Sequence, residues 1–221
     1  QACVVYGAAE FSRDIDLAIS SEEENLRRLQ AALNELQAAT IAVPPFQQEY
    51  LANGLAVHFR CQHPEAENFR VDVMSKMRGV DEFPNLWQRR TTLDNIELLS
   101  LPDLVKAKKT QRDKDWPMLS RLVEANYFIH RDKPTPQQIE FWLRELRHPD
   151  LLLEVSRRYP QERARLLAER PLLAKQRTPE LQAALKEEEF RERELDRQYW
   201  QPLRKILADL RSRARLDQTG E

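Results

Sequence analysis

Two aspartates that alternate with apolar residues constrain the N-terminal part of this chain most strongly. They lie in the run Ser12-Arg13-Asp14-Ile15-Asp16, which follows a glycine-bearing loop at residues 7–11. Successive side chains on a strand point to opposite faces, so Asp14 and Asp16 share one face while the intervening apolar residues pack beneath. Neighbouring carboxylates repel each other unless a cation lies between them. The pattern therefore predicts a strand over residues 14–20 with a site for Mg²⁺ and, through Mg²⁺, for phosphates.

The composition suits one medium domain with an extension, or two small domains. The chain has 221 residues, a formal net charge of -1 and an apolar share of 41%, which can build a core. Near-neutral charge argues against a protein that coats nucleic acid nonspecifically. No apolar run is long enough to span a bilayer, so no membrane partner is expected. Only two cysteines, Cys3 and Cys61, are present, and a reducing cytoplasm is the expected location.

Periodicity predicts an α/β fold with a helical C-terminal part. Alternating or continuous apolar runs predict strands at residues 2–6, 14–20, 55–60, 69–74 and 95–99. Helical spacing predicts helices over 22–38 with Ser20 or Ser21 as N-cap, from Ser100-Leu101 onward, over 116–128, from Thr135-Pro136, and over 178–215. The highly charged stretch 186–196 is interpreted as a solvated helix or a short coiled coil.

A third carboxylate, Asp72, extends the candidate site. It lies with Arg70 and Met74 on the polar face of the predicted strand 69–74, while Phe69, Val71 and Val73 form the other face. If this strand neighbours strand 14–20, three carboxylates converge at one edge of a sheet. Two of them can hold metal ions, and the third can share a metal or accept a proton from an acceptor hydroxyl. For Asp72 alone, an ordinary exposed strand position is the simpler alternative.

The run Tyr6-Gly7 to Asp16, together with Asp72, resembles the nucleotidyltransferase superfamily with the DNA polymerase β-like fold. More narrowly, it resembles the small bacterial nucleotidyltransferases related to AbiEii-type toxins. The resemblance covers about residues 1–130. It implies a nucleotidyltransferase-like mixed sheet flanked by helices, Mg²⁺ as cofactor (two ions), and a nucleoside triphosphate as substrate. The family's Gly-Gly pair is expected immediately before Gln1.

A basic segment extends the resemblance. Lys108, Arg112 and Asp115 fall at i, i+4 and i+7 and share one face if a single helix carries them. The segment resembles the basic helix of AbiEii-like proteins, which faces the nucleotide. The resemblance implies that Lys108 neutralises the triphosphate and that Asp115 holds a Lys or Arg in place. A solvated helix surface remains an alternative for this face.

Other conspicuous residues receive simpler interpretations. Ser12 contacts a phosphate or caps a turn, and Arg13 pairs with the substrate or with Glu10. His58, Cys61 and His63 give no closed zinc set, so Cys61 is expected in the core and His63 in a loop. The tryptophans are expected to be core anchors rather than base-stacking platforms, namely Trp87, Trp116 and Trp142.

The sequence thus predicts an enzyme, a cytoplasmic Mg²⁺-dependent nucleotidyltransferase. Its nucleotidyltransferase-like domain would cover residues 1–134 and its all-helical C-terminal extension residues 135–221. Asp14, Asp16 and Asp72 would be the catalytic and metal-binding residues. The residues expected to bind the nucleotide are Ser12, Arg13, Lys108 and Asp115. The acceptor is a tRNA, a protein or a small molecule.

Two other functions stay open. One is a toxin of a toxin–antitoxin pair that modifies tRNA or protein and binds an antitoxin. The other is a catalytically silent interaction protein of the same fold, which associates with itself or with a partner through its C-terminal helices.

Overall fold

The computed structural model describes residues 1–12 and 14–219 and divides the chain into two compact units. The sheet unit contains Gln1, Phe11–Ser100 and Gln198–Glu221, and the helical unit contains Ala2–Glu10 and Leu101–Arg197. The sheet unit ends at Ser100 in its central segment, and the helices after Leu101 pack successively on one another. The domain boundary expected at residue 134 stays a prediction.

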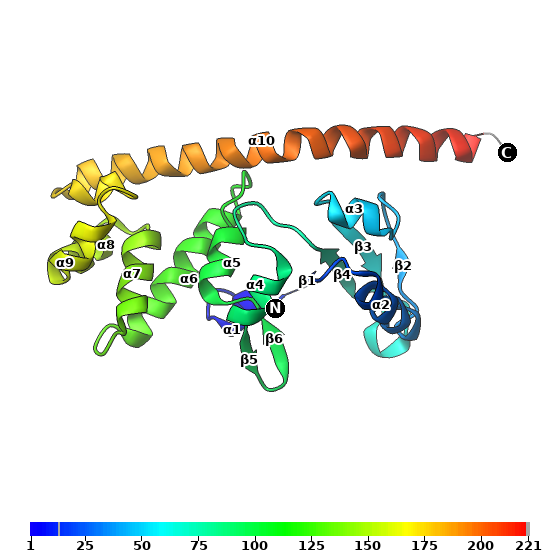
Figure 1. Ribbon diagram of the computed structural model, residues 1–221, viewed down its shortest axis with the longest axis horizontal. Coiled ribbons are helices and arrows are strands. Elements are labelled where there is room, and N and C mark those ends of the chain that lie inside the picture. Colours follow the sequence, from blue (N-terminus) through cyan, green and yellow to red (C-terminus); the bar gives the residue numbers. More distant parts are fainter. Residues whose placement is uncertain (13, 220–221) are drawn as a thin grey trace. The chain divides into compact units, whose positions relative to one another are not determined.

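The sheet unit is built on a four-stranded mixed sheet, as the α/β prediction requires. The strand order is β1 (Asp14–Ala18), β4 (Arg70–Met74), β3 (Val57–Arg60) and β2 (Ala39–Thr40). Strand β1 is parallel to β4, and the other two pairings are antiparallel (Figure 1). The expected neighbourhood of the two aspartate-bearing strands is therefore confirmed.

One face of this sheet packs into an apolar core. Helices α2 (Glu23–Glu35) and α3 (Gln48–Ala52) supply Leu33 and Leu51, both of which are buried. The strands supply the alternate residues that the period of two predicts. The buried members from β3, β4 and the loop after β3 are Val57, Phe59, Cys61, Val71 and Val73. Because this face takes the apolar side chains, the alternate polar ones are left on the opposite face.

The remaining elements of the sheet unit are short. A 3₁₀ helix spans Pro64–Ala66, and His63 Nδ1 accepts a hydrogen bond from the Glu65 N–H at its start, which agrees with a loop position for His63. Helix α4 spans Phe83–Arg89. Strands β5 (Thr91–Leu93) and β6 (Ile96–Leu98) form a hairpin whose two turn residues, Asp94 and Asn95, have positive φ. That backbone geometry is the one that Asp and Asn tolerate best in tight hairpins.

The N-terminal prediction was wrong. Residues 2–6 form no strand; Ala2–Val5 is a short helix, α1, in the helical unit. Helical hydrogen bonds continue to Ala8, whose N–H donates to the Cys3 carbonyl at 2.8 Å, and Ala8 is buried. A Cβ on Gly7 would lie in ordinary contact with Ala125 of α6. The strand expected from the two valines is thus replaced by a short helix whose own four residues are not buried.

The helical unit is formed by consecutive helices and the first part of a long one. They are α5 (Leu101–Ala107), α6 (Asp115–His130), α7 (Pro136–Glu145), α8 (Pro149–Arg158), α9 (Pro160–Leu166), a 3₁₀ helix (Pro171–Ala174) and α10 (Thr178–Thr219). Thr135 and Gln138 form a capping box at α7, so that predicted start is confirmed. Trp142 and Tyr127 are fully buried and pack edge to face. Across residues 1–12 and 14–219, each helix lacks either the length or the apolarity that crossing a bilayer requires.

Two local predictions need correction. Helix α2 has Glu22 rather than Ser20 or Ser21 at its N-cap, and Ser20 Oγ accepts the Glu22 N–H at 3.2 Å. Trp116 and Trp142 are core residues as predicted, but Trp87 is 46% exposed. Its ring stacks on Phe83 in the first turn of α4, and the Arg90 guanidinium lies 4.0 Å from the ring centroid. Contacts with Phe83 and Arg90, both close in sequence, thus hold Trp87 at the surface.

The buried Tyr127 should make stability sensitive to alkaline pH. Burial and the hydrogen bond that its hydroxyl donates to Glu154 at 2.7 Å raise the pKa of Tyr127 to about 12. The unfolded chain loses this proton near pH 10, whereas the folded chain retains it up to about pH 12. The contribution to stability is therefore complete below pH 10 and declines as the pH rises toward 12. Urea unfolding at a series of pH values should show this loss, and Tyr127→Phe should abolish that part of it. An equal alkaline loss in both proteins would contradict the assignment.

Candidate functional site

A polar face of the sheet carries the predicted carboxylates. Asp14 is the register partner of Arg70, and Asp16 is the register partner of Asp72, across the parallel β1–β4 pair. On the other side of β4, His58 is the partner of Asp72. Register partners in neighbouring strands point to the same face, so these side chains lie together. We call this group the carboxylate face, and it comprises Asp14, Asp16, His58, Arg70 and Asp72.

Asp72 is the buried centre of the carboxylate face. The residue is 7% exposed, and Arg70 holds both of its carboxylate oxygens. Arg70 Nε donates to Oδ1 at 2.7 Å and Arg70 Nη2 donates to Oδ2 at 2.9 Å. His58 Nδ1 lies 2.8 Å from Oδ1 and 3.2 Å from Arg70 Nη2. A two-pronged guanidinium–carboxylate pair of this kind is among the stronger polar contacts in proteins.

Arg70 also interacts with the other two aspartates. Its hydrogen bonds to Asp72 raise the pKa of Arg70, while partial burial lowers it; the charges of Asp72, Asp14 and Asp16 raise it further. The guanidinium therefore lies within electrostatic reach of all three carboxylates. A cation between the alternating aspartates was expected from the sequence; Arg70 is a cation of the protein on the same face, bound to Asp72.

The loop before β1 is held by Ser12. Its hydroxyl donates to the Asp14 carbonyl at 2.8 Å and lies 3.3 Å from Asp14 Oδ1. These contacts favour the turn-capping interpretation of Ser12 in the ligand-free chain, and its phosphate contact stays a prediction. Arg13 was also expected to contact the triphosphate, and it lies outside the described residues.

The carboxylate face fits Mg²⁺ only in part. Within residues 1–12 and 14–219, His, Cys, Asp and Glu side chains form no group of three or more that could hold a metal ion. Asp72 does not fit as arranged, because Arg70 occupies both of its oxygens. Asp14 and Asp16 fit in their chemistry, since Mg²⁺ is often bound by one or two carboxylates together with substrate phosphates. A pair of metal ions and a metal-binding role for Asp72 stay predictions.

The predicted basic helix is interrupted. Helix α5 ends at Ala107 and α6 begins at Asp115, so Lys108 and Arg112 lie in the connecting loop and do not share a helix face with Asp115. Asp115 is nonetheless buried and accepts from Arg112 Nε at 2.7 Å, which matches its predicted task of holding a basic side chain. Lys108 and Asp115 both belong to the helical unit. Their contact with a nucleotide stays a prediction.

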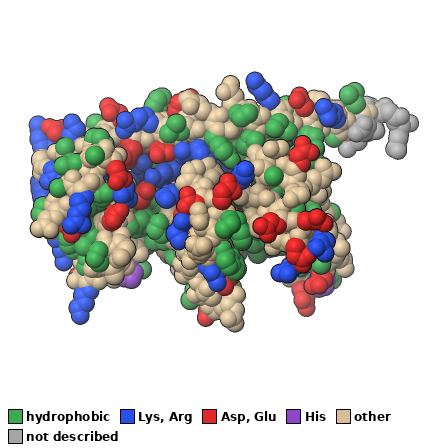
Figure 2. Space-filling model, viewed as in Figure 1, with side chains coloured by type: hydrophobic (Ala, Val, Ile, Leu, Met, Phe, Trp, Pro, Cys, Tyr) green, Lys and Arg blue, Asp and Glu red, His purple; other side chains and the backbone are tan. Residues whose placement is uncertain are grey.

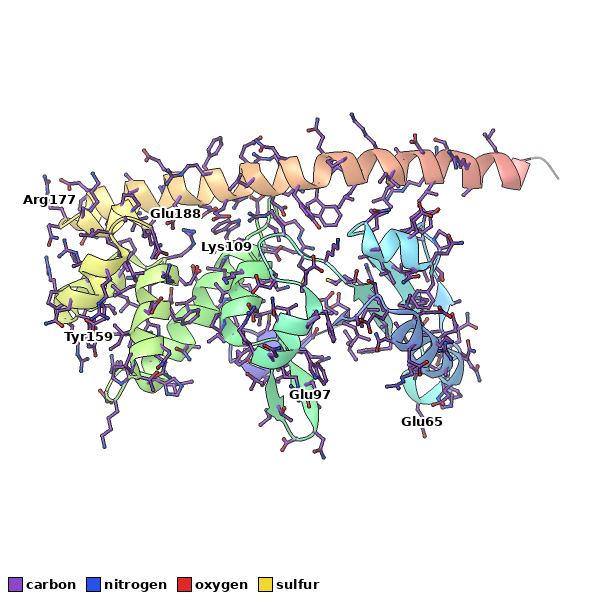
Figure 3. All side chains as sticks on the ribbon, viewed as in Figure 1. Glu65, Glu97, Lys109, Tyr159, Arg177 and Glu188 are labelled. Carbon is purple, nitrogen blue, oxygen red and sulfur yellow. The ribbon has the colours of Figure 1, made fainter. Side chains whose placement is uncertain are left out.

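The charged middle of α10 is solvated only in part: Lys186, Glu187 and Arg191 are exposed, whereas Glu188 pairs with buried arginines. Glu188 accepts from Arg170 Nε at 3.0 Å and Nη2 at 2.8 Å, and its Oε2 lies 3.1 Å from Arg147 Nη1. The two arginine side chains are only 6% and 7% exposed. Burial would raise the pKa of Glu188, but the Arg170 hydrogen bonds and the charges of Arg170 and Arg147 outweigh burial and lower it. Figure 3 labels Glu188 on α10 within this unit.

Further polar contacts join α10 to the helical unit. Asp196, 2% exposed, accepts the Gln111 N–H at 2.9 Å, and Arg193 bridges Glu189 and Asp113. Elsewhere in the unit, Lys109 Nζ lies 2.8 Å from Glu145. Figure 2 shows basic and acidic side chains interspersed over the visible surface rather than separated into large fields. Several charges of 186–196 thus serve packing between helices.

Comparison with known proteins gave no assignment: protein-family models, curated proteins and solved structures were searched, and none matches significantly.

Sequence reasoning missed the part that Arg70 and His58 play in the site. The signal for Arg70 was available, because it precedes Asp72 by two residues on the same strand face. An arginine at that spacing reaches a carboxylate directly. His58 could be placed only once the antiparallel register of β3 and β4 was known.

Proposed function

We propose that this protein is a Mg²⁺-dependent nucleotidyltransferase that moves a nucleoside monophosphate from a nucleoside triphosphate to an acceptor. The observation that carries the proposal is the register of β1 and β4, which puts Asp14 and Asp16 on one face with Asp72 directly opposite Asp16. Strand β1 lies at the edge of the sheet, and Asp16 is exposed. The family resemblance of the surrounding motif supports the same function.

In this proposal the chain's own groups position the reactants. Asp14 and Asp16 would hold Mg²⁺, which would neutralise phosphate oxygens of the triphosphate and make the phosphorus easier to attack. The acceptor hydroxyl oxygen forms a bond to the α-phosphorus, the bond from that phosphorus to the bridging oxygen breaks, and pyrophosphate leaves. Once Arg70 has moved away from Asp72, the Asp72 carboxylate accepts the proton of the acceptor hydroxyl. Positioning and charge neutralisation, rather than covalent chemistry by the protein, supply most of the catalysis.

A labelled-nucleotide assay tests this function. The purified chain is incubated with each α-labelled nucleoside triphosphate, Mg²⁺ and a cell extract, and the labelled product is separated into RNA, protein and small-molecule fractions. We expect label in one fraction, dependent on Mg²⁺ and lost with EDTA. Label in tRNA or protein, together with toxicity on expression that Asp16→Ala relieves, would favour the toxin function. Absence of label from every fraction with all four nucleotides would contradict the proposal.

The silent interaction protein is the second candidate, and the closed Arg70–Asp72 pair favours it. Calorimetry with Mg²⁺-ATP separates the two functions. A transferase of the proposed kind is expected to bind the nucleotide, with binding weakened by Asp14→Asn. A silent protein has no need for such binding, and its C-terminal helices would be its working surface.

A further inference from the structure

The carboxylate face already contains a cation, and this has a consequence for metal binding. Arg70 makes two hydrogen bonds to Asp72, at 2.7 and 2.9 Å, and interacts electrostatically with Asp14 and Asp16. Its side chain is 41% exposed, whereas that of Asp72 is 10% exposed. The guanidinium can therefore move toward solvent, but the carboxylate cannot.

We infer that Arg70 is an internal counter-cation that competes with divalent metal for the carboxylate face. When Arg70 is bound to Asp72, both oxygens of Asp72 are occupied, and the electrostatic field of the guanidinium opposes a second cation on this face. When a metal ion engages Asp72, Arg70 must leave it. The inference rests on the proposed function. The competition between Arg70 and a divalent metal ion can nevertheless be measured without any nucleotide transfer.

The position of Arg70 on β4 indicates where its side chain lies after it leaves Asp72. It projects from the first residue of β4, opposite Asp14, at the end of the strand pair that Ser12 precedes. An arginine released there remains beside the carboxylates and presents several N–H donors to an anion. A nucleoside triphosphate that brings its own Mg²⁺ supplies both the cation that replaces Arg70 and the phosphates that receive it. Metal alone supplies the replacing cation but no phosphates to receive Arg70, so the protein without nucleotide should bind divalent cations weakly.

The test measures Mn²⁺ binding to the full chain without nucleotide, from the electron paramagnetic resonance signal of free Mn²⁺. Arg70→Gln removes the competing charge, and we expect it to tighten Mn²⁺ binding about tenfold, the effect of losing one charge-assisted pair. Arg70→Lys keeps the charge without the two-pronged geometry and should give a smaller gain. The matched control is Arg28→Gln: Arg28 is exposed on α2, which packs against the opposite, apolar face of the sheet, and its loss changes the net charge equally.

Two results would overturn the inference. One is Mn²⁺ affinity in Arg70→Gln no higher than in Arg28→Gln, with both variants folded by circular dichroism. The other is a gain in Arg70→Gln that persists when Asp72→Asn is added, since the gain should pass through Asp72. If Arg70→Gln fails to fold, Arg70→Lys decides on the same comparison.

The outcome is separable from that of the proposed function. Tighter Mn²⁺ binding in Arg70→Gln without nucleotide transfer by the wild type would keep the inference and reject the transferase. Nucleotide transfer by the wild type, together with unchanged Mn²⁺ affinity in Arg70→Gln, would keep the transferase and reject the inference.

Discussion

Asp16→Asn is expected to reduce nucleotide transfer by at least about a hundredfold, the scale of losing one main electrostatic contributor to a transition state. Asp16 is the most exposed carboxylate of the site and lies directly opposite Asp72. The substitution keeps the size of the side chain and removes the charge that would hold the cation. Initial rates of transfer at saturating triphosphate measure the effect once the acceptor fraction is known.

The control for this prediction is Asp94→Asn. Asp94 is exposed in the β5–β6 turn with positive φ, a conformation that Asn also adopts readily, so the charge change is the same and the fold is undisturbed. Transfer by Asp16→Asn at the rate of the control would refute an involvement of the carboxylate face in the reaction.

Glu188→Ala is expected to destabilise the folded protein by about 3–5 kcal/mol, because it leaves buried charges without a partner. Arg170 and Arg147 are both more than nine-tenths buried, and Glu188 pairs with each. Arg170 would still donate to the Leu143 and Leu146 carbonyls at 2.8 and 3.1 Å, but its positive charge would be uncompensated. Urea unfolding followed by circular dichroism measures the change.

Glu187→Ala provides the comparison, since Glu187 is exposed on the adjacent position of α10 and should change stability little. The wild type should also show the pH dependence of the ion pair. Because the pKa of Glu188 is lowered in the folded protein, its contribution is complete above the ordinary value of 4.5 and is lost as the pH falls below it. Equal unfolding midpoints for the two variants would show that the buried pair contributes nothing.

The sequence predicted the strands of the sheet more accurately than the structure of the N-terminal residues. Alternation in Asp14–Ala18 and Arg70–Met74 survives because each strand packs one face into a core, which makes the period of two visible. Val4 and Val5 lie in a short helix instead, because a run this short carries too little periodicity to distinguish a strand from a helix. The break between α5 and α6 agrees with the two separate helices predicted there, and it removes the condition under which Lys108, Arg112 and Asp115 would share one face.

The carboxylates of the candidate site could be predicted from the sequence, but the pairing of Arg70 with Asp72 could not. Side chains on one strand can be assigned to a face from the sequence, and the parallel pairing of β1 and β4 then brings the aspartates together. Whether Arg70 turns toward Asp72 or toward solvent depends on side-chain torsions that no periodicity encodes. The charged run in α10 misled in part for a related reason, since a pattern shows charge but not the partner that neutralises it.

The long helix α10 affects the order in which the protein can be completed during synthesis. Its residues from Gln198 onward belong to the sheet unit, where Leu203 is buried and Tyr199 approaches Gly54. A ribosome that has translated only the first hundred residues has made every strand of the sheet but not the helix segment that completes its unit. The helical unit, apart from residues 2–10, is continuous in the chain and is finished earlier. The sheet unit is therefore completed by a segment that is translated about a hundred residues after its last strand.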